Sequence, residues 1–235
     1  MKTGHHGQNL IKLTRLGAVN FYLVREDDGF TVVDTGISGS AKGILAAARA
    51  AGAPIRRITV THGHADHTGS LDALTAEAPD AEVILPAREA RLMRDDRAPV
   101  ATEPKPPPGG SPLSPGAIPR RRAAASREVA PGDRLGSLEV VDAAGHSPGQ
   151  VALLDVRDRT LIAGDAFANL GGLYVTSQVN PRFPLPALVT WDRPTALRNA
   201  RALRALNPSL LAVGHGAVIE EPVVAMDRAI ATASA

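Results

Sequence analysis

The feature that most constrains this chain is the run of residues 62–67, which carries three histidines and one aspartate within six positions. The run lies between a segment expected to be a buried strand and one expected to be a helix. His62 and His64 are two positions apart, so in an extended loop their rings project to the same side and can share one ion. Asp66 and His67 fall where the chain turns toward the helix, which directs them to a second ion. The run therefore predicts a metal site.

The composition limits which residue types can bind a metal ion and which kinds of partner the protein can have. The chain has no cysteine, which excludes disulfides and thiolate ligands and leaves nitrogen and oxygen donors. The formal net charge is only +2, and residues 120–122, all arginine, are expected to form a solvated loop rather than a phosphate-binding patch. No apolar run approaches the roughly 20 residues of a membrane span, and residues 1–10 lack the apolar stretch of a secretory signal. We expect a cytoplasmic protein that acts on a small-molecule substrate. It is expected to bind neither nucleic acid nor membrane, and it can form a homodimer or act as a monomer.

Strand-like and helix-like segments alternate along the chain. Two successive groups of strands and helices predict an α/β protein with two packed sheets and helices outside, in a single domain over 1–235. Prolines and glycines are frequent from about 98 to 119, so this stretch is expected to be a long loop, either a lid or disordered. Strands are expected at 19–24, 30–33, 57–61, 81–85, 138–141, 151–156, 160–163 and 210–213, and helices at 41–51, 70–78, 194–206 and 222–233.

Three later residues are candidate ligands because each follows or precedes an expected strand in a glycine-rich turn. They are His146 in a Gly-His-Ser-Pro-Gly turn, Asp165 in a Gly-Asp pair and His215 in a Gly-His-Gly turn. Functional side chains gather at such strand ends. Each histidine alone would more often be structural, but together with the run at 62–67 they indicate one shared site.

The pattern His62-x-His64-x-Asp66-His67, followed by these three turns, resembles the signature of the metallo-β-lactamase superfamily over about residues 17–219. The resemblance, to the glyoxalase II and lactonase-like branch, implies a four-layer αββα sandwich of two mixed β-sheets with helices on both outer faces. It also implies two divalent metal ions, expected to be zinc, with iron or manganese as alternatives. In the implied arrangement, one ion is held by His62, His64 and His146, the other by Asp66, His67 and His215, and Asp165 bridges them.

The same resemblance implies an enzyme. The expected reaction is hydrolysis of an ester-like bond, a thioester or a lactone, by a metal-bridging hydroxide. Asp66 would also carry a proton to the leaving group as a catalytic residue. The alternatives are a sulfur dioxygenase with one iron, a phosphodiesterase or β-lactam hydrolase of the same superfamily, and a protein that binds metal without turnover.

Two further sites can be interpreted from their surroundings. Asp34, in a Val-Asp-Thr-Gly turn, matches the family's Asp-x-Gly turn and is expected to orient a ligand imidazole through its other ring nitrogen. The alternative is a turn residue that caps its own loop. His5 and His6 lie in a glycine-flanked terminus without a partner motif, so we expect them in a disordered tail.

Four aromatic residues are candidates either for the pocket lining or for the core: Phe167, Tyr174, Phe183 and Trp191. The best-known lactonases of the family carry a tyrosine three residues after the bridging aspartate, where this chain has Ala168. Tyr174 is close enough in sequence to be considered as a substitute for that tyrosine.

Overall fold

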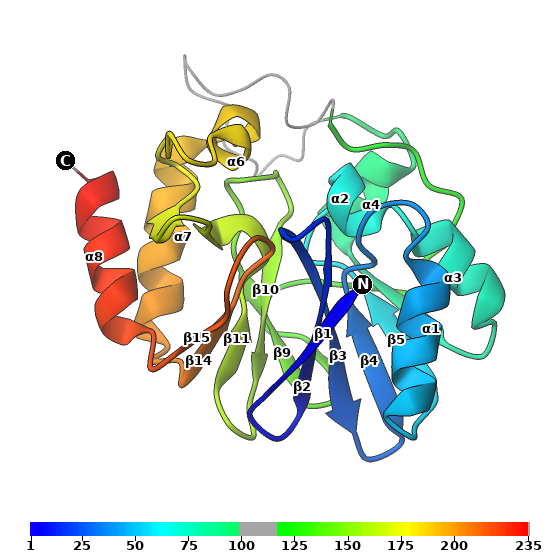
Figure 1. Ribbon diagram of the computed structural model, residues 1–235. Helices are drawn as coiled ribbons and strands as arrows, with labels where there is room; N and C mark the ends of the chain where they lie inside the picture. The colour runs from blue at the N-terminus through cyan, green and yellow to red at the C-terminus, as the bar shows by residue number, and fades with distance from the viewer. Residues whose placement is uncertain (99–116, 235) are drawn as a thin grey trace.

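The fold is built on two main sheets that face each other (Figure 1). The computed structural model describes residues 1–98 and 117–234. The first sheet has seven strands in sequence order, with antiparallel pairing at its N-terminal end and parallel pairing from β4 to β7. Its strands are β1 (Lys2–His6), β2 (Leu10–Arg15), β3 (Val19–Glu26), β4 (Gly29–Val33), β5 (Ile55–Thr59), β6 (Glu82–Pro86) and β7 (Arg127–Val129).

The second sheet has six strands in the order β15-β14-β11-β10-β9-β8, and β12 pairs with β13 in a separate ribbon. The pair β11–β14 is parallel and the other pairs of this sheet are antiparallel, so both main sheets are mixed. These strands are β8 (Arg134–Leu135), β9 (Leu138–Asp142), β10 (Val151–Asp155), β11 (Thr160–Ile162), β12 (Phe167–Asn169), β13 (Leu173–Val175), β14 (Leu210–Ala212) and β15 (Ile219–Glu220).

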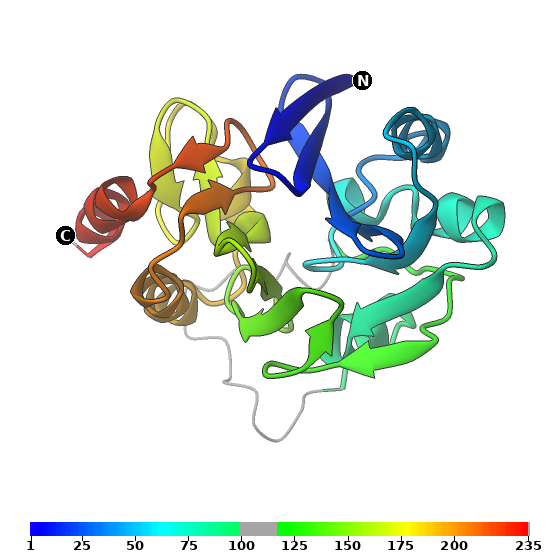
Figure 2. The same ribbon diagram turned by 90° about the horizontal axis from the view of Figure 1, so that it is seen from below.

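Helices cover the outer faces of both sheets (Figures 1 and 2). The helices α1 and α3 lie outside the first sheet, whereas α7 and α8 lie outside the second. The mixed two-sheet sandwich expected from the sequence is therefore confirmed. None of the helices in the described part of the chain is long and apolar enough to cross a bilayer. The helices are α1 (Ala41–Ala50), α2 (Ala65–Thr68), α3 (Leu71–Glu77), α4 (Ala87–Met93), α6 (Leu185–Val189), α7 (Arg193–Ala205) and α8 (Val223–Ala233).

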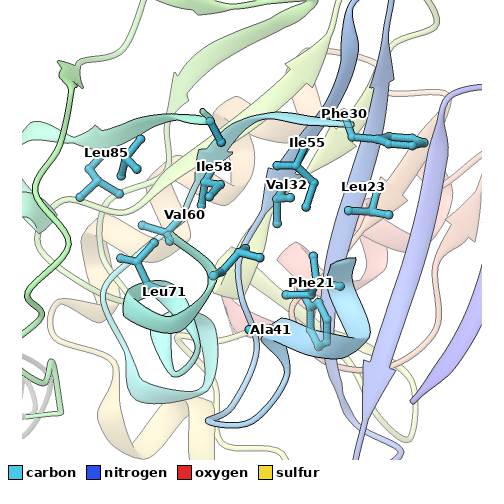
Figure 3. Close-up of a cluster of buried hydrophobic side chains, with 14 of the residues drawn as sticks. Phe21, Leu23, Phe30, Val32, Ala41, Ile55, Ile58, Val60, Leu71 and Leu85 are labelled. Carbon is cyan, nitrogen blue, oxygen red and sulfur yellow. The ribbon is translucent and has the colours of Figure 1, made fainter. Parts of the chain in front are cut away.

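Strand periodicity divides the apolar side chains among three cores. Successive strand residues point to opposite faces, so Phe21 and Leu23 of β3 pack toward α1 and α3, whereas Tyr22 and Val24 pack between the sheets. Figure 3 shows the first of these cores, in which Phe21 lies near Ala41 of α1. The second sheet divides its side chains in the same way between the inter-sheet core and the core under α7 and α8. Three cores between four layers are what hold this sandwich together.

The expected elements are all present, with ends shifted by at most two residues. The prediction of a disordered tail at His5 and His6 was wrong. Both residues belong to β1, where they pair with Ile11 and Leu10 of β2. An edge strand held by backbone hydrogen bonds needs no apolar alternation, so no periodic pattern marks residues 2–6 as a strand. Most of the expected loop or lid at 98–119 lies outside the described residues, and the single-domain organisation and cytoplasmic location stay predictions.

Strand direction brings the candidate site to one edge of the sandwich. The strands β4 and β5 are parallel, as are β11 and β14, so the carboxyl ends of each pair lie side by side. Asp34 follows β4, His62 follows β5, Asp165 follows β11 and His215 follows β14. His146 precedes β10, which runs antiparallel to β11 and therefore begins at the same edge. The topology thus gathers five segments that are far apart in sequence.

Gly145 is required where the loop before His146 meets α7. Its φ is +135°, and an added Cβ would lie 2.3 Å from the backbone nitrogen of Ala196. Gly39 has a φ of +82° but nothing within 4 Å of an added Cβ. We expect Gly145→Ala to lower the free energy of unfolding by about 3 kcal/mol or more, because it combines a backbone penalty with a clash.

Gly39→Ala is the matched control, since it carries the backbone penalty alone, about 1 kcal/mol. Urea unfolding of the two variants measures the difference. Equal losses of stability would show that the close approach to α7 does not constrain this loop.

Candidate metal centre

Three imidazoles converge on one point at the sheet edge. His64 Nδ1 lies 3.1 Å from His62 Nε2 and 3.0 Å from His146 Nε2. Nitrogens that share a tetrahedral zinc at about 2.05 Å lie about 3.3 Å apart. The three nitrogens are therefore spaced as ligands of one ion would be, although His146 is 82 residues from His64.

A second group lies beside the first. Asp66 Oδ2 is 3.3 Å from His215 Nε2 and 3.8 Å from His67 Nε2. Asp66 and His67 come from α2, and the His67 ring lies between His62, 4.1 Å away by ring centroids, and His215, 5.6 Å away. These three residues offer ligand atoms that all lie within 4.8 Å of one another.

Asp165 stands between the two groups. One carboxylate oxygen, Oδ2, lies 3.5 Å from His146 Nε2 and 3.1 Å from His215 Nε2. The other, Oδ1, lies 3.4 Å from His67 Nε2. The structure thus brings together all seven side chains that the sequence singled out, with Asp165 in the position that a bridging ligand would need.

Hydrogen bonds on the far side of two rings fix where their lone pairs point. Asp34 Oδ2 lies 2.9 Å from His67 Nδ1, and a carboxylate can only accept, so Nδ1 carries the proton. The Thr61 hydroxyl donates to Asp34 at 2.9 Å and therefore accepts from His62 Nδ1 at 3.1 Å. In the neutral ring, each Nε2 then presents its lone pair to the site. Asp34 is more than a turn residue, because it orients one imidazole directly and a second through Thr61.

His146 is oriented in the same way by a residue that the sequence did not indicate. Its Nδ1 lies 3.0 Å from the Thr190 hydroxyl. The carbonyl oxygens of Thr176 at 2.9 Å and Pro186 at 2.8 Å share the single hydrogen of that hydroxyl, so it accepts from the imidazole. Thr190 directly follows α6 and lies 44 residues from His146. No spacing rule connects the two positions, whereas Thr61 could have been found as the residue just before His62.

Unpartnered atoms test whether a cation fits here. His67 Nε2 and Asp165 Oδ1 are buried and make no hydrogen bond to any described residue. Buried polar atoms are normally satisfied, and these two atoms lie 3.4 Å from each other, where a cation would give each of them a partner. A nitrogen and oxygen donor set of five imidazoles and two carboxylates suits a divalent ion such as zinc. The residues present therefore fit the group that the sequence implied.

Burial and charge divide the histidines into two kinds. Burial and the neighbouring imidazoles hold the pKa of His62 well below its usual range, and burial lowers the pKa of His146 to about 3. Burial also lowers the pKa of His215, but Asp165 and Asp66 outweigh it and raise the value to about 9. His62 and His146 of the first cluster are thus neutral donors, whereas His215 of the second cluster favours a positive charge.

The carboxylates are ionised. Burial raises the pKa of Asp165, but His215 and His67 outweigh it and hold the pKa well below its usual range. Burial also raises the pKa of Asp66, but His67 and His215 outweigh this effect and hold the pKa low. Ionised carboxylates in a buried site require positive charge beside them, either on protonated imidazoles or on a metal ion.

Glu89 joins the two ligand loops from behind, and sequence reasoning missed it. This fully buried carboxylate accepts hydrogen bonds from Gly63 N at 2.7 Å, Ser147 Oγ at 2.8 Å and Gly149 N at 2.7 Å. Burial raises the pKa of Glu89 despite these three donors. Gly63 separates two candidate ligands and Ser147 follows a third, so one side chain sets the distance between the loops. Glu89 lies inside the short helix α4, where no motif marks it.

The candidate aromatic residues divide between core and cavity. Phe167, Tyr174 and Trp191 are buried, and the Tyr174 hydroxyl donates to the carbonyl oxygen of Phe183 at 2.8 Å. Tyr174 does not line the cavity above the ligands and its hydroxyl is engaged by Phe183, so the structure does not support the suggestion that it replaces the tyrosine of the lactonases. The Phe183 ring centroid lies 5.1 Å from that of His215. Of the four, Phe183 lines the cavity above the ligands.

That cavity has a volume of about 260 Å³ and opens to solvent above the ligand cluster. Five of the seven candidate ligands form its floor. Its remaining described lining is apolar and comprises Ala65, Ala117, Phe183, Leu185, Pro186 and Val189.

Comparison with known proteins places these features in a family. The model of the metallo-beta-lactamase superfamily matches residues 14–215. The uncharacterized protein YobT of Bacillus subtilis (strain 168) is 39% identical over 213 residues, which cover 90% of this chain and 89% of that protein. The "probable metallo-hydrolase YflN" of the same organism is 29% identical over 216 residues, which cover 84% of this chain and 80% of that protein.

A solved structure extends the comparison to the fold. The crystal structure of TTHA1623 in a di-iron-bound form superposes with a TM-score of 0.64 and 25% sequence identity. The superposition covers 91% of this chain and 95% of that one. The sandwich fold is thus shared with a protein of similar length.

Replacing Glu89 should loosen both ligand loops. In Glu89→Gln one of the three donors faces an amide NH₂ instead of an oxygen, and an unsatisfied buried donor costs about 1–3 kcal/mol. We expect a loss of stability of that size and roughly a tenfold weaker affinity for zinc. Urea unfolding and competition with a chromophoric chelator measure the two effects.

Ser147→Ala is the control, because it removes one donor and leaves the carboxylate bonded to both backbone N–H groups. Its effect on zinc affinity should be the smaller one. Unchanged affinity in Glu89→Gln would mean that the carboxylate does not position the ligands.

Proposed function

Because the chain belongs to the metallo-β-lactamase superfamily, we propose that it is a binuclear metal-dependent hydrolase that cleaves a thioester or lactone of a small molecule. The observation that carries the proposal is the fixed inward direction of three imidazole lone pairs beside the carboxylate of Asp165. His62, His64 and His146 would hold one ion. Asp66, His67 and His215 would hold the other, with Asp165 shared.

Two divalent cations at these ligands would lower the pKa of a water molecule and polarise the carbonyl oxygen under attack. Zinc suits the donor set because it accepts nitrogen and carboxylate ligands in a tetrahedral arrangement. Iron is the main alternative, which the di-iron-bound form of TTHA1623 supports, and manganese is a further one.

Asp66 is the ligand candidate best placed to move a proton. Its side chain is 36% exposed and lines the cavity, whereas that of Asp165 is 4% exposed. Its low pKa leaves it ionised at neutral pH, so it can first accept a proton and then deliver it to the leaving group. The carboxylate thus has access to both the site and the substrate.

The full ligand set bears on the alternatives from the sequence. A dioxygenase with one iron needs a single group of ligands, whereas Asp66, His67 and His215 supply a second one. The apolar cavity wall offers little to the anionic backbone of a phosphodiester. Both features favour hydrolysis of an uncharged ester-like bond.

Metal removal tests the proposal. We expect the zinc-loaded protein to hydrolyse at least one of a panel of thioesters and lactones, with about two zinc ions per chain. Exhaustive chelation should abolish turnover and added zinc should restore it. Turnover that survives chelation, or one iron per chain with oxygen uptake, would contradict the proposal; phosphodiesters and β-lactams in the panel test the other branches of the superfamily.

Removing the carboxylate of Asp66 should slow the reaction. We expect Asp66→Asn to lower kcat by a factor of about 100 or more while the protein remains folded, because proton transfer contributes roughly 10²–10⁴-fold. Metal content is measured in parallel, so that a lost ion can be told from a lost proton carrier. Asp80→Asn, at an exposed turn on the outer surface, is the control. Full activity in Asp66→Asn would exclude the proton-transfer role.

A further inference from the structure

We infer that a second cavity, at the edge of the sandwich opposite the candidate ligands, binds an aliphatic polyamine. The inference goes beyond the proposed function, because none of the candidate metal ligands lines this cavity. Its volume is about 520 Å³, twice that of the cavity above the ligands. We refer to it below as the lower cavity.

The lower cavity lies where the two sheets meet at their far edge. Its lining comes from the turn between β1 and β2 in the first sheet. In the second sheet it comes from the turn between β10 and β11 and from the adjoining ends of β14 and β15. Figures 1 and 2 show the β1–β2 hairpin beside β14 and β15. Thr160 and Leu210, which line the cavity, begin β11 and β14. Asp165 and His215 follow the opposite ends of these two strands, so the two sites are separate.

The hydroxyl of Thr160 is the observation that points to a ligand. The residue is only 5% exposed and lines the lower cavity. Ile162, two positions along β11, packs in the core between the sheets, so the side chain of Thr160 points to the same side, into the cavity. The backbone N–H of Thr160 donates to Asp158 Oδ1 at 2.9 Å, but no hydrogen bond joins its hydroxyl to any described residue. Buried polar groups are normally bonded, and a ligand with N–H groups would supply the partner.

The charge of the lining selects a cation. Asp158, Glu220 and Glu221 line the lower cavity. Arg157 is the one cation among the described lining residues, and its guanidinium is paired with Asp155 at 2.6 Å. Three carboxylates are therefore left without an opposite charge of their own. A cationic ligand is attracted to such a lining, whereas an anionic one is repelled.

An organic cation fits the lower cavity better than a metal ion does. Among the described residues, the groups of three or more donors close enough to hold an ion all lie at the candidate metal centre. The carboxylates of the lower cavity thus do not converge on one point. Ammonium groups spaced along a chain match carboxylates spaced around a cavity. The side chain of Leu210, which is also 5% exposed, offers the methylene groups an apolar surface.

The volume of the lower cavity indicates the size of the ligand. At about 30 Å³ for each water-sized group, about 520 Å³ takes roughly 17 heavy atoms. A linear triamine such as spermidine has about ten heavy atoms, so it fits together with several water molecules. A single small ammonium ion would leave most of the cavity to water.

Calorimetric titration with spermidine tests the inference. We would use the full-length protein loaded with zinc, so that the carboxylates of the metal centre are already occupied. Spermidine should bind at one site per chain, with a Kd roughly tenfold or more below that of butylamine, which has a single charge. An equal concentration of calcium should not displace it. Absence of binding, butylamine that binds as tightly as spermidine, or displacement by calcium would overturn the inference.

A matched pair of threonine variants locates the site. Thr160→Val removes the hydroxyl and keeps the shape of the side chain, and it should raise the Kd of spermidine roughly fivefold or more. Thr31→Val is the control. Thr31 is also buried, and its hydroxyl has no hydrogen bond to a described residue, but it lies on β4 outside the lower cavity. Its Kd should not change. Equal effects of the two variants, or no effect of Thr160→Val, would contradict the assignment.

A pair of charge variants tests the carboxylates at exposed positions, where substitution does not endanger folding. Glu220→Gln should raise the Kd of spermidine roughly threefold. Glu77→Gln removes the same charge from the exposed surface of α3 and should have no effect. Equal effects would show attraction to the net charge of the protein rather than to the lower cavity, and would overturn the inference. None of these measurements depends on hydrolysis, so this inference and the proposed function fail separately.

Discussion

The site depends on one buried carboxylate, Asp34. It accepts a hydrogen bond from His67 Nδ1 directly, and it orients His62 through the Thr61 hydroxyl. Without these bonds each ring could place its proton on either nitrogen and lose its alignment. Because both outer nitrogens are engaged, the inner ones face the same space. Asp34 itself comes directly after β4, and its backbone N–H donates to the carbonyl oxygen of Thr59 at the end of β5. The pairing of two parallel strands therefore controls the chemistry of the imidazoles.

The local part of this arrangement could be predicted from the sequence. His62 and His64 share a side because of their spacing, and the apolar periodicity of residues such as Phe21 and Tyr22 predicts the two faces of a strand. Thr190 and Glu89 could not be predicted. Their partners lie tens of residues away, and contacts of that kind are set by how the layers pack, which no local spacing encodes.

Contacts with neighbouring elements explain why β1 and α6 were not predicted from the sequence. The strand β1 presents no buried apolar face, since its residues are mostly exposed, and it exists because β2 offers a free edge. The helix α6 has only five residues and begins next to Pro184. Such elements are stabilised by what they touch rather than by their own propensity. They nevertheless matter, because α6 carries the cavity wall and leads into Thr190.

The candidate ligands are contributed by both sheets. His62, His64, Asp66 and His67 follow a strand of the first sheet, whereas His146, Asp165 and His215 adjoin strands of the second. Separating the sheets would split each cluster. An ion bound by a cluster would therefore cross-link the two sheets. By mass action, its binding free energy would add to the free energy of unfolding of the whole domain.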